Sequence, residues 1–143
     1  MKKQKTTIYY VALPYTKNPD VSFATSAYYC MKLRKKGLFP FSPIMHTHHY
    51  DLLLNQIKNK NGLLSDEKKY FESEHYIEWD LEILHSFKKC VILMDESAYS
   101  INKDGSIKWE SKGCKKEYKF AKSHNIKVFK LQPFIEKDIE EEL

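Results

Sequence analysis

The stretch CVILMDES at residues 90–97 decides the fold, together with the stretch ESKGCKKE at residues 110–117. The first is a short apolar run, typical of a buried strand, that ends in polar residues. The second contains Ser111 and Gly113 and opens a helical run that ends near His124. A buried strand followed by a helix is the repeating unit of a parallel sheet, so we expect an α/β fold.

The same alternation extends toward both ends of the chain. Apolar runs predict strands, helical spacing predicts the helices between them, and Gly37 is expected to end the first helix. Strands are expected at residues 8–13, 38–42, 90–94 and 126–131, and helices at about 21–36, 74–88 and 111–123. We therefore predict one domain over residues 1–143, a three-layer sandwich with a parallel sheet of four to five strands.

Three further expectations concern segments outside the strands. In the first helix, apolar residues recur at helical spacing, namely Ala24, Ala27, Tyr28, Met31 and Leu33. Residues 44–73 are expected to form a long loop or lid with a short helix near 51–58, because connections of this length are often binding loops. Residues 133–143 are expected to form an acidic, solvated tail.

Composition limits the classes of function. Hydrophobic residues are 42% and charged residues 30% of the 143 residues, which is ordinary for a soluble globular protein. The net charge is +5, but Arg34 is the only arginine, which argues against direct reading of DNA sequence. Three cysteines without paired spacing, and the lack of a long apolar run, predict a cytoplasmic protein with free thiols and no membrane partner.

The first candidate site residues lie in the stretch at 110–117. Ser111 and Gly113 at a helix start offer a hydroxyl and free N–H groups, which suit a phosphate or another anion. Glu117 lies more than one turn deeper, where an acid is not needed for capping, and could act on a phosphorylated sugar. The alternative is that Ser111 is only an N-cap and Glu117 only a solvated helix residue.

Asp80 is the second notable acid. It lies at helical spacing from Ile77 and Leu84, so we expect it on the inward face of its helix. A carboxylate there costs free energy unless it is paired or hydrogen-bonded. Asp80 either holds a backbone or lysine partner at the rim of the core or has a functional role.

The histidine-rich segment is a weaker signal. His46, His48 and His49, with Asp51, have no matching cysteine or glutamate cluster, so no metal ion and no cofactor is expected. His46 follows a strand end and is expected to be a donor in the pocket. His48 and His49 are expected on the surface.

Four motifs together resemble the nucleoside 2-deoxyribosyltransferase superfamily. YVALPYT at residues 10–16 resembles its first-strand motif. FSPIMH at 41–46 and WDLEIL at 79–84 resemble motifs of a small bacterial and phage branch described as a domain of unknown function. SKGCKKE at 111–117 resembles the S-x-G-x3-E motif of deoxynucleoside 5′-monophosphate N-glycosidases. The four matches occur in the family's order and cover about residues 8–131.

The resemblance implies a flavodoxin-like or Rossmann-like fold and chemistry at the N-glycosidic bond of a nucleoside or nucleotide. By this analogy Glu117 is the nucleophile that attacks C1′, and Asp80 orients the reactants or helps to protonate the base. Family members are commonly dimers or larger, so a homodimer or higher homo-oligomer is expected. The analogy, with the positions of the strand ends, gives as substrate-binding residues Pro14, Tyr15, Ser42, His46, Trp79, Asp95, Ser111 and Gly113.

Several alternatives stay open at this point. A non-catalytic nucleotide-binding or sensing module would keep Tyr15, Ser111 and Gly113 but would need no ionised Glu117. A nucleic-acid-binding domain is disfavoured by the scarcity of arginine and the lack of a lysine stripe with aromatics. The first loop lacks the Gly-Ser step of the monophosphate N-glycosidases, so the 5′ substituent is undecided. Hydrolase and transferase are not distinguished.

Overall fold

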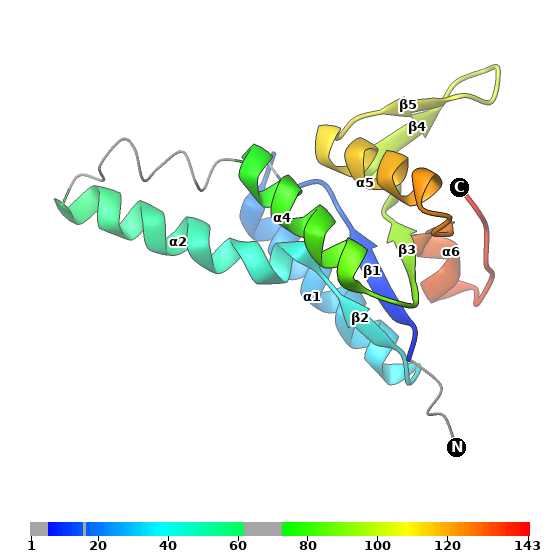
Figure 1. Ribbon diagram of the computed structural model, residues 1–143, viewed down its shortest axis with the longest axis horizontal. Coiled ribbons are helices and arrows are strands. Elements are labelled where there is room, and N and C mark those ends of the chain that lie inside the picture. Colours follow the sequence, from blue (N-terminus) through cyan, green and yellow to red (C-terminus); the bar gives the residue numbers. More distant parts are fainter. Residues whose placement is uncertain (1–5, 16, 62–72) are drawn as a thin grey trace.

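The chain folds around a four-stranded parallel sheet in the order β2-β1-β3-β6 (Figure 1). The computed structural model describes residues 6–15, 17–61 and 73–143. The strands are β1 (Ile8–Ala12), β2 (Phe39–Phe41), β3 (Cys90–Met94) and β6 (Val128–Lys130). The predicted parallel α/β sheet is confirmed, and its arrangement with flanking helices is that of a flavodoxin-like or Rossmann-like sandwich.

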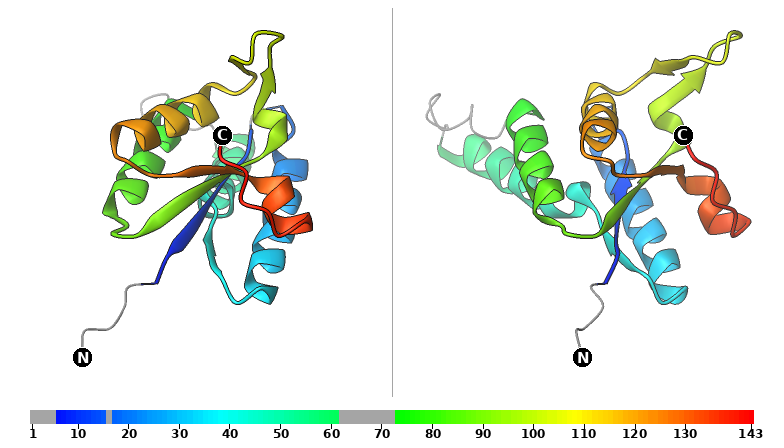
Figure 2. Two further views of the ribbon diagram at one scale, coloured as in Figure 1. Left: turned by 90° about the vertical axis from the view of Figure 1, so that its right-hand side faces the viewer. Right: turned by 45° about the vertical axis from the view of Figure 1, so that its right-hand side comes forward.

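Helices cover both faces of the sheet, as the two views of Figure 2 show. On one side lie α4 (Ser73–Ser86) and α5 (Lys112–Ser123), and on the other α1 (Pro19–Lys35) and α6 (Leu131–Glu136). Successive residues of β1 serve the two cores: Tyr10 packs in the α4–α5 core, whereas Val11 packs in the α1–α6 core. This alternation follows from the two-residue period of a strand.

The segment expected to be a long loop is largely helical. Residues Pro43–Asn61 form α2, while residues 62–72 of the expected loop lie outside the described part of the chain. The Ser42 hydroxyl accepts a hydrogen bond from the Met45 N–H at 3.3 Å, and Pro43 occupies the first helical position. A serine cap followed by proline is a helix start signal. The interpretation as a loop over 44–61 is therefore corrected.

The C-terminal segment is only in part the solvated tail that its charge predicted: residues 136–140 and Glu142 are exposed, as expected, but the apolar residues before them are not. Phe134 and Ile135 of α6 are buried in the core against α1. Beyond α6 the chain returns along the edge of the sheet, where Leu143 N–H donates to the Val128 carbonyl at 2.8 Å. Apolar positions within the acidic run therefore attach it to the domain.

The helix predicted from this spacing is confirmed as α1, but only Leu33 of the spaced apolar residues is buried. Ala24, Tyr28 and Met31 are exposed, and the buried residues are Ser26 and Leu33. Apolar residues occupy both sides of this helix, so spacing alone did not identify the packed side. The predicted helix end at Gly37 is confirmed, with a φ of 81° and an N–H that donates to the Arg34 carbonyl at 2.9 Å.

The segment between β3 and α5 contains three short elements that were not predicted. After β3 a short 3-10 helix, η2 (Glu96–Ala98), leads into a two-stranded antiparallel hairpin of β4 (Tyr99–Ile101) and β5 (Ile107–Trp109). The hairpin follows β3 and precedes α5 in the chain, and Figure 1 shows it beyond α5, away from the four-stranded sheet. Three-residue strands give too short an alternation to be recognised.

Candidate functional site

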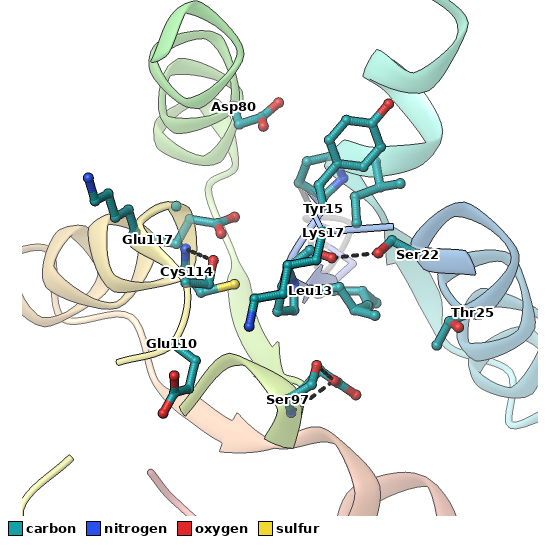
Figure 3. Close-up of a pocket in the computed structure, with 18 of the residues that line it drawn as sticks. Leu13, Tyr15, Lys17, Ser22, Thr25, Asp80, Ser97, Glu110, Cys114 and Glu117 are labelled. Atoms are coloured by element: carbon teal, nitrogen blue, oxygen red, sulfur yellow. Dashed lines mark hydrogen bonds between the residues drawn. The ribbon is translucent and has the colours of Figure 1, made fainter. Parts of the chain in front are cut away.

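A cavity of about 890 Å³ opens where β1 and β3 end, between α1, α4 and α5 (Figure 3). This is the carboxyl end of the parallel sheet, where ligands bind in open α/β folds. The size is within the range of small-molecule sites. Most of the sequence-predicted site residues line the cavity, namely Pro14, Tyr15, Asp80, Asp95, Ser111, Gly113 and Glu117.

Glu117 lies on the inward face of α5. It is only 4% exposed and shares this face with Cys114 and Ala121 at helical spacing, while the lysines of the helix face solvent. Burial raises the pKa of Glu117 from 4.5 to about 8. The nearby Tyr10 hydroxyl and Cys114 thiol lower the pKa, and the Asp80 carboxylate raises it by repulsion. The interpretation of Glu117 as a solvated helix residue is wrong.

Asp80 lies on the inward face of α4, one turn from Tyr76 and one turn from Leu84, and is 5% exposed. Burial raises its pKa from 3.8 to about 7. Its Oδ1 atom is buried and has no hydrogen-bond partner among the described residues. The structural alternative required such a partner, and a buried polar atom without one is uncommon and costly.

Tyr10 completes this buried polar group and was not singled out from the sequence. The Tyr10 side chain, on β1, is fully buried, and its hydroxyl makes no hydrogen bond to any described residue. Burial, and then the charges of Glu117 and Asp80, raise the pKa of Tyr10 well above its usual value. A tyrosine at a core position of a central strand was the available signal, since its hydroxyl needs a polar neighbour.

Gly113 sets the approach of the two helices that bear the carboxyls. A Cβ atom at this position would lie 2.6 Å from Ile77 Cδ1 of α4. Ile77 is one turn before Asp80, and Gly113 is one turn before Glu117. The glycine therefore lets α4 and α5 pack closely beside the carboxyl pair.

Ser111 is the N-cap of α5, which was one of the two alternatives for this residue. Its hydroxyl oxygen accepts a hydrogen bond from the Cys114 N–H at 3.2 Å, and the residue also lines the cavity. The positive end of the α5 dipole faces the same space. Exposed lysines (Lys17, Lys112 and Lys116) and exposed glutamates (Glu96 and Glu110) line the cavity here, so the helix start, and not net side-chain charge, is the feature that suits an anionic group.

Asp95 lines the cavity at the end of β3, but local hydrogen bonds satisfy its carboxylate. It accepts from the Ser97 N–H at 3.1 Å, from the Ser97 hydroxyl and from the Gln132 amide. The same amide group donates to the Tyr29 hydroxyl at 3.3 Å. Asp95 therefore shapes the floor of the cavity and begins η2.

Three predicted residues do not line the cavity. Ser42 is buried against the Ser26 hydroxyl, to which it is hydrogen-bonded. His46 and Trp79 pack edge to face, with ring centroids 4.6 Å apart, where α2 approaches α4. The structure places these three residues in contacts between helices and apart from the carboxyl pair.

The position expected for His48 is wrong. This residue was expected on the surface, yet it is only 5% exposed, and its Nδ1 lies 2.9 Å from the Tyr15 hydroxyl. Ile44, Thr47 and His48 share the buried face of α2, a helical spacing that becomes visible once α2 is treated as a helix. His49 is exposed, as expected.

The structure describes residues 6–15, 17–61 and 73–143. None of their His, Cys, Asp or Glu side chains gather in threes or more in a way that could hold a metal ion. None of their helices has the length and apolar character needed to span a membrane. The site consists of a buried carboxyl pair beside a tyrosine hydroxyl, at a cavity that exposed lysines and glutamates also line. Comparisons with protein-family models, curated proteins and solved structures found no match to this chain.

Proposed function

We propose that the chain cleaves or transfers the N-glycosidic bond of a nucleoside or nucleotide, with Glu117 as nucleophile. The observation that carries the proposal is the pair of buried carboxyls, Asp80 and Glu117, which reach one cavity from two adjacent helices. Figure 3 draws both side chains on the same side of that cavity. The motif resemblance assigns the same two residues to the reaction.

The chemistry needs one ionised and one protonated carboxyl. The Glu117 carboxylate forms a bond to C1′ while the C1′–N bond breaks and its electron pair leaves with the base. Asp80 supplies a proton to the leaving base, as the acid of a glycosidase pair does. Water at C1′ then gives hydrolysis, whereas a second base gives transfer.

The electrostatics of the site support a pair of carboxyls that holds one proton near neutral pH. Burial raises the pKa of Asp80 to about 7 and that of Glu117 to about 8, so each carboxyl is kept near its titration point at neutral pH. Ionisation of one opposes ionisation of the other, so the pair shares one proton in this range. Positive charge that develops on the sugar favours the ionised Glu117 in the transition state.

The rest of the cavity fits the parts of a nucleotide. Tyr15 stands across the cavity from Asp80 and Glu117 (Figure 3) and offers an aromatic wall. The start of α5 offers positive charge for a 5′ phosphate or a similar anionic group. A charged 5′ substituent is thus part of the proposal.

The test of substrate class is chromatographic detection of free base. Wild-type protein is incubated with deoxynucleosides, deoxynucleoside 5′-monophosphates, ribonucleotides and NAD. Release of base from the 5′-monophosphates, faster than from the unphosphorylated nucleosides, is expected. If one of these compounds binds tightly but no base is released from any of them, the protein is a sensing module of the same fold and not an enzyme.

A further inference from the structure

The side chain of Tyr15 is held by a residue that does not line the cavity. Tyr15 belongs to the loop after β1, and His48 belongs to α2. The Tyr15 hydroxyl lies 2.9 Å from His48 Nδ1, and the two rings meet edge to face with centroids 5.9 Å apart. His48 is not part of the cavity wall, so it contacts Tyr15 from behind.

His48 is itself fixed from two directions by α1. Its ring stacks on Phe23 with centroids 4.4 Å apart and an interplanar angle of 21°. Its Nε2 lies 3.5 Å from Asp20 Oδ1. A carboxylate only accepts hydrogen bonds, so the tautomer with its proton on Nε2 suits both neighbours, because Nδ1 then accepts from the Tyr15 hydroxyl.

The loop that carries Tyr15 has a second attachment to α1. The Ser22 hydroxyl donates to the Pro14 carbonyl at 2.7 Å. Figure 3 shows the Tyr15 hydroxyl directed away from Glu117, with the ring beside the cavity. The hydroxyl is therefore directed toward its anchor, and the ring is what Tyr15 presents to the cavity.

We propose that His48 is a positioning residue that fixes the Tyr15 ring as a stacking wall for a planar base, with Asp20 orienting the His48 ring. The inference rests on the proposed function for the identity of the ligand. In this arrangement the Tyr15 hydroxyl is hydrogen-bonded to His48 and not to the substrate. Holding an aromatic ring in its bound position removes ordering cost from binding, so the contribution is to affinity.

A double-mutant cycle tests the coupling. His48→Phe keeps the ring stack on Phe23 and removes both nitrogens, while Tyr15→Phe keeps the aromatic wall and removes the hydroxyl. Each variant is expected to raise KM for base release by roughly fivefold, the value of one neutral hydrogen bond, with kcat changed by less than about twofold. The double variant is expected to be no worse than either single variant. His49→Phe, at the exposed neighbouring position, is the matched control and is expected to change neither constant.

Two kinetic results would overturn the inference while leaving the proposed function intact. One is an additive double variant. The other is a large loss of kcat in Tyr15→Phe that His48→Phe does not share, which would mean that the hydroxyl acts on the substrate. His48→Asn retains an acceptor near the Nδ1 position and is expected to restore much of the affinity; no recovery relative to His48→Phe would count against the hydrogen bond.

A spectroscopic measurement separates this inference from the proposed function. If wild type releases no base from any nucleotide, the proposed function fails, and ¹⁵N NMR of histidine-labelled protein still tests the anchor. His48 is expected to show a protonated Nε2 and an unprotonated Nδ1, with a change in the Nδ1 signal in Tyr15→Phe and none at His49. An unchanged His48 Nδ1 signal in Tyr15→Phe would overturn the inference. Tyr15→Phe leaves the buried histidine in place, so this measurement does not depend on the folding of the His48 variants.

Discussion

Replacing Glu117 by glutamine should stabilise the protein at alkaline pH. The carboxyl is 4% exposed, and burial raises its pKa from 4.5 to about 8. A carboxyl with a raised pKa holds its proton more tightly in the folded state than in the unfolded state. Its contribution to stability is fully present below pH 4.5 and is lost as the pH rises through about 8. Glutamine has nearly the same shape and does not ionise, so the variant escapes this loss.

The size of the effect follows from the pKa. Each unit is worth about 1.4 kcal/mol, so the rise from 4.5 to about 8 sets an upper limit of about 5 kcal/mol. Water that enters the cavity relieves part of this cost, and we expect a gain of roughly 2–4 kcal/mol at pH 9. At pH 4 both side chains are neutral, and the two proteins should differ by less than about 1 kcal/mol.

Urea denaturation followed by circular dichroism, at intervals from pH 4 to pH 9, measures this difference. Glu82→Gln on the exposed side of α4 is the matched control and should follow wild type throughout. A Glu117→Gln variant that is less stable than wild type at pH 9 would refute the reasoning. So would a difference that is the same at every pH, because it would show that Glu117 is not held with an unfavourable charge.

Three further predictions concern the reaction. Asp80→Asn should lower kcat more than it raises KM, because an amide cannot give a proton to the base; an unchanged kcat would return Asp80 to a structural role. The rate of base release should fall below about pH 7, where both carboxyls are protonated, and above about pH 8, where both are ionised; a profile that is flat between pH 6 and pH 9 would contradict the shared proton. Gly113→Ala should reduce kcat/KM several-fold while unfolding free energy stays within about 1 kcal/mol of wild type, because helix propensity favours alanine. Adding Ile77→Val, which removes the Cδ1 atom that the new Cβ would meet at 2.6 Å, should restore activity; no recovery would mean that helix approach is not the cause.

The local patterns of the sequence were sufficient for the sheet and for the two acids. The apolar run at 90–94 and the helix after Ser111 give a parallel strand and its crossover helix, as found. Asp80 shares the spacing of Ile77 and Leu84, and this periodicity placed it correctly on the inward face of α4. These features depend on neighbours a few residues apart, which a sequence displays directly.

Features that depend on distant residues were not predicted. The hydrogen bond between Tyr15 and His48 joins residues 33 positions apart, and the sequence gives no sign of it. The helix α2 was missed because polar histidines occupy positions on and beside its packed face, which weakens the apolar period. The acidic run near the C-terminus hid Phe134 and Ile135, whose burial depends on α1 being adjacent.

The central claim is that Glu117 forms a bond to the sugar when the base leaves. The most direct measurement is the rate of base release from a deoxynucleoside 5′-monophosphate by wild type, Glu117→Gln and the control Glu82→Gln, under the same conditions. We predict release by wild type and by Glu82→Gln, with a loss of at least about a thousandfold in Glu117→Gln. Release by Glu117→Gln at the wild-type rate would contradict the assignment of the nucleophile.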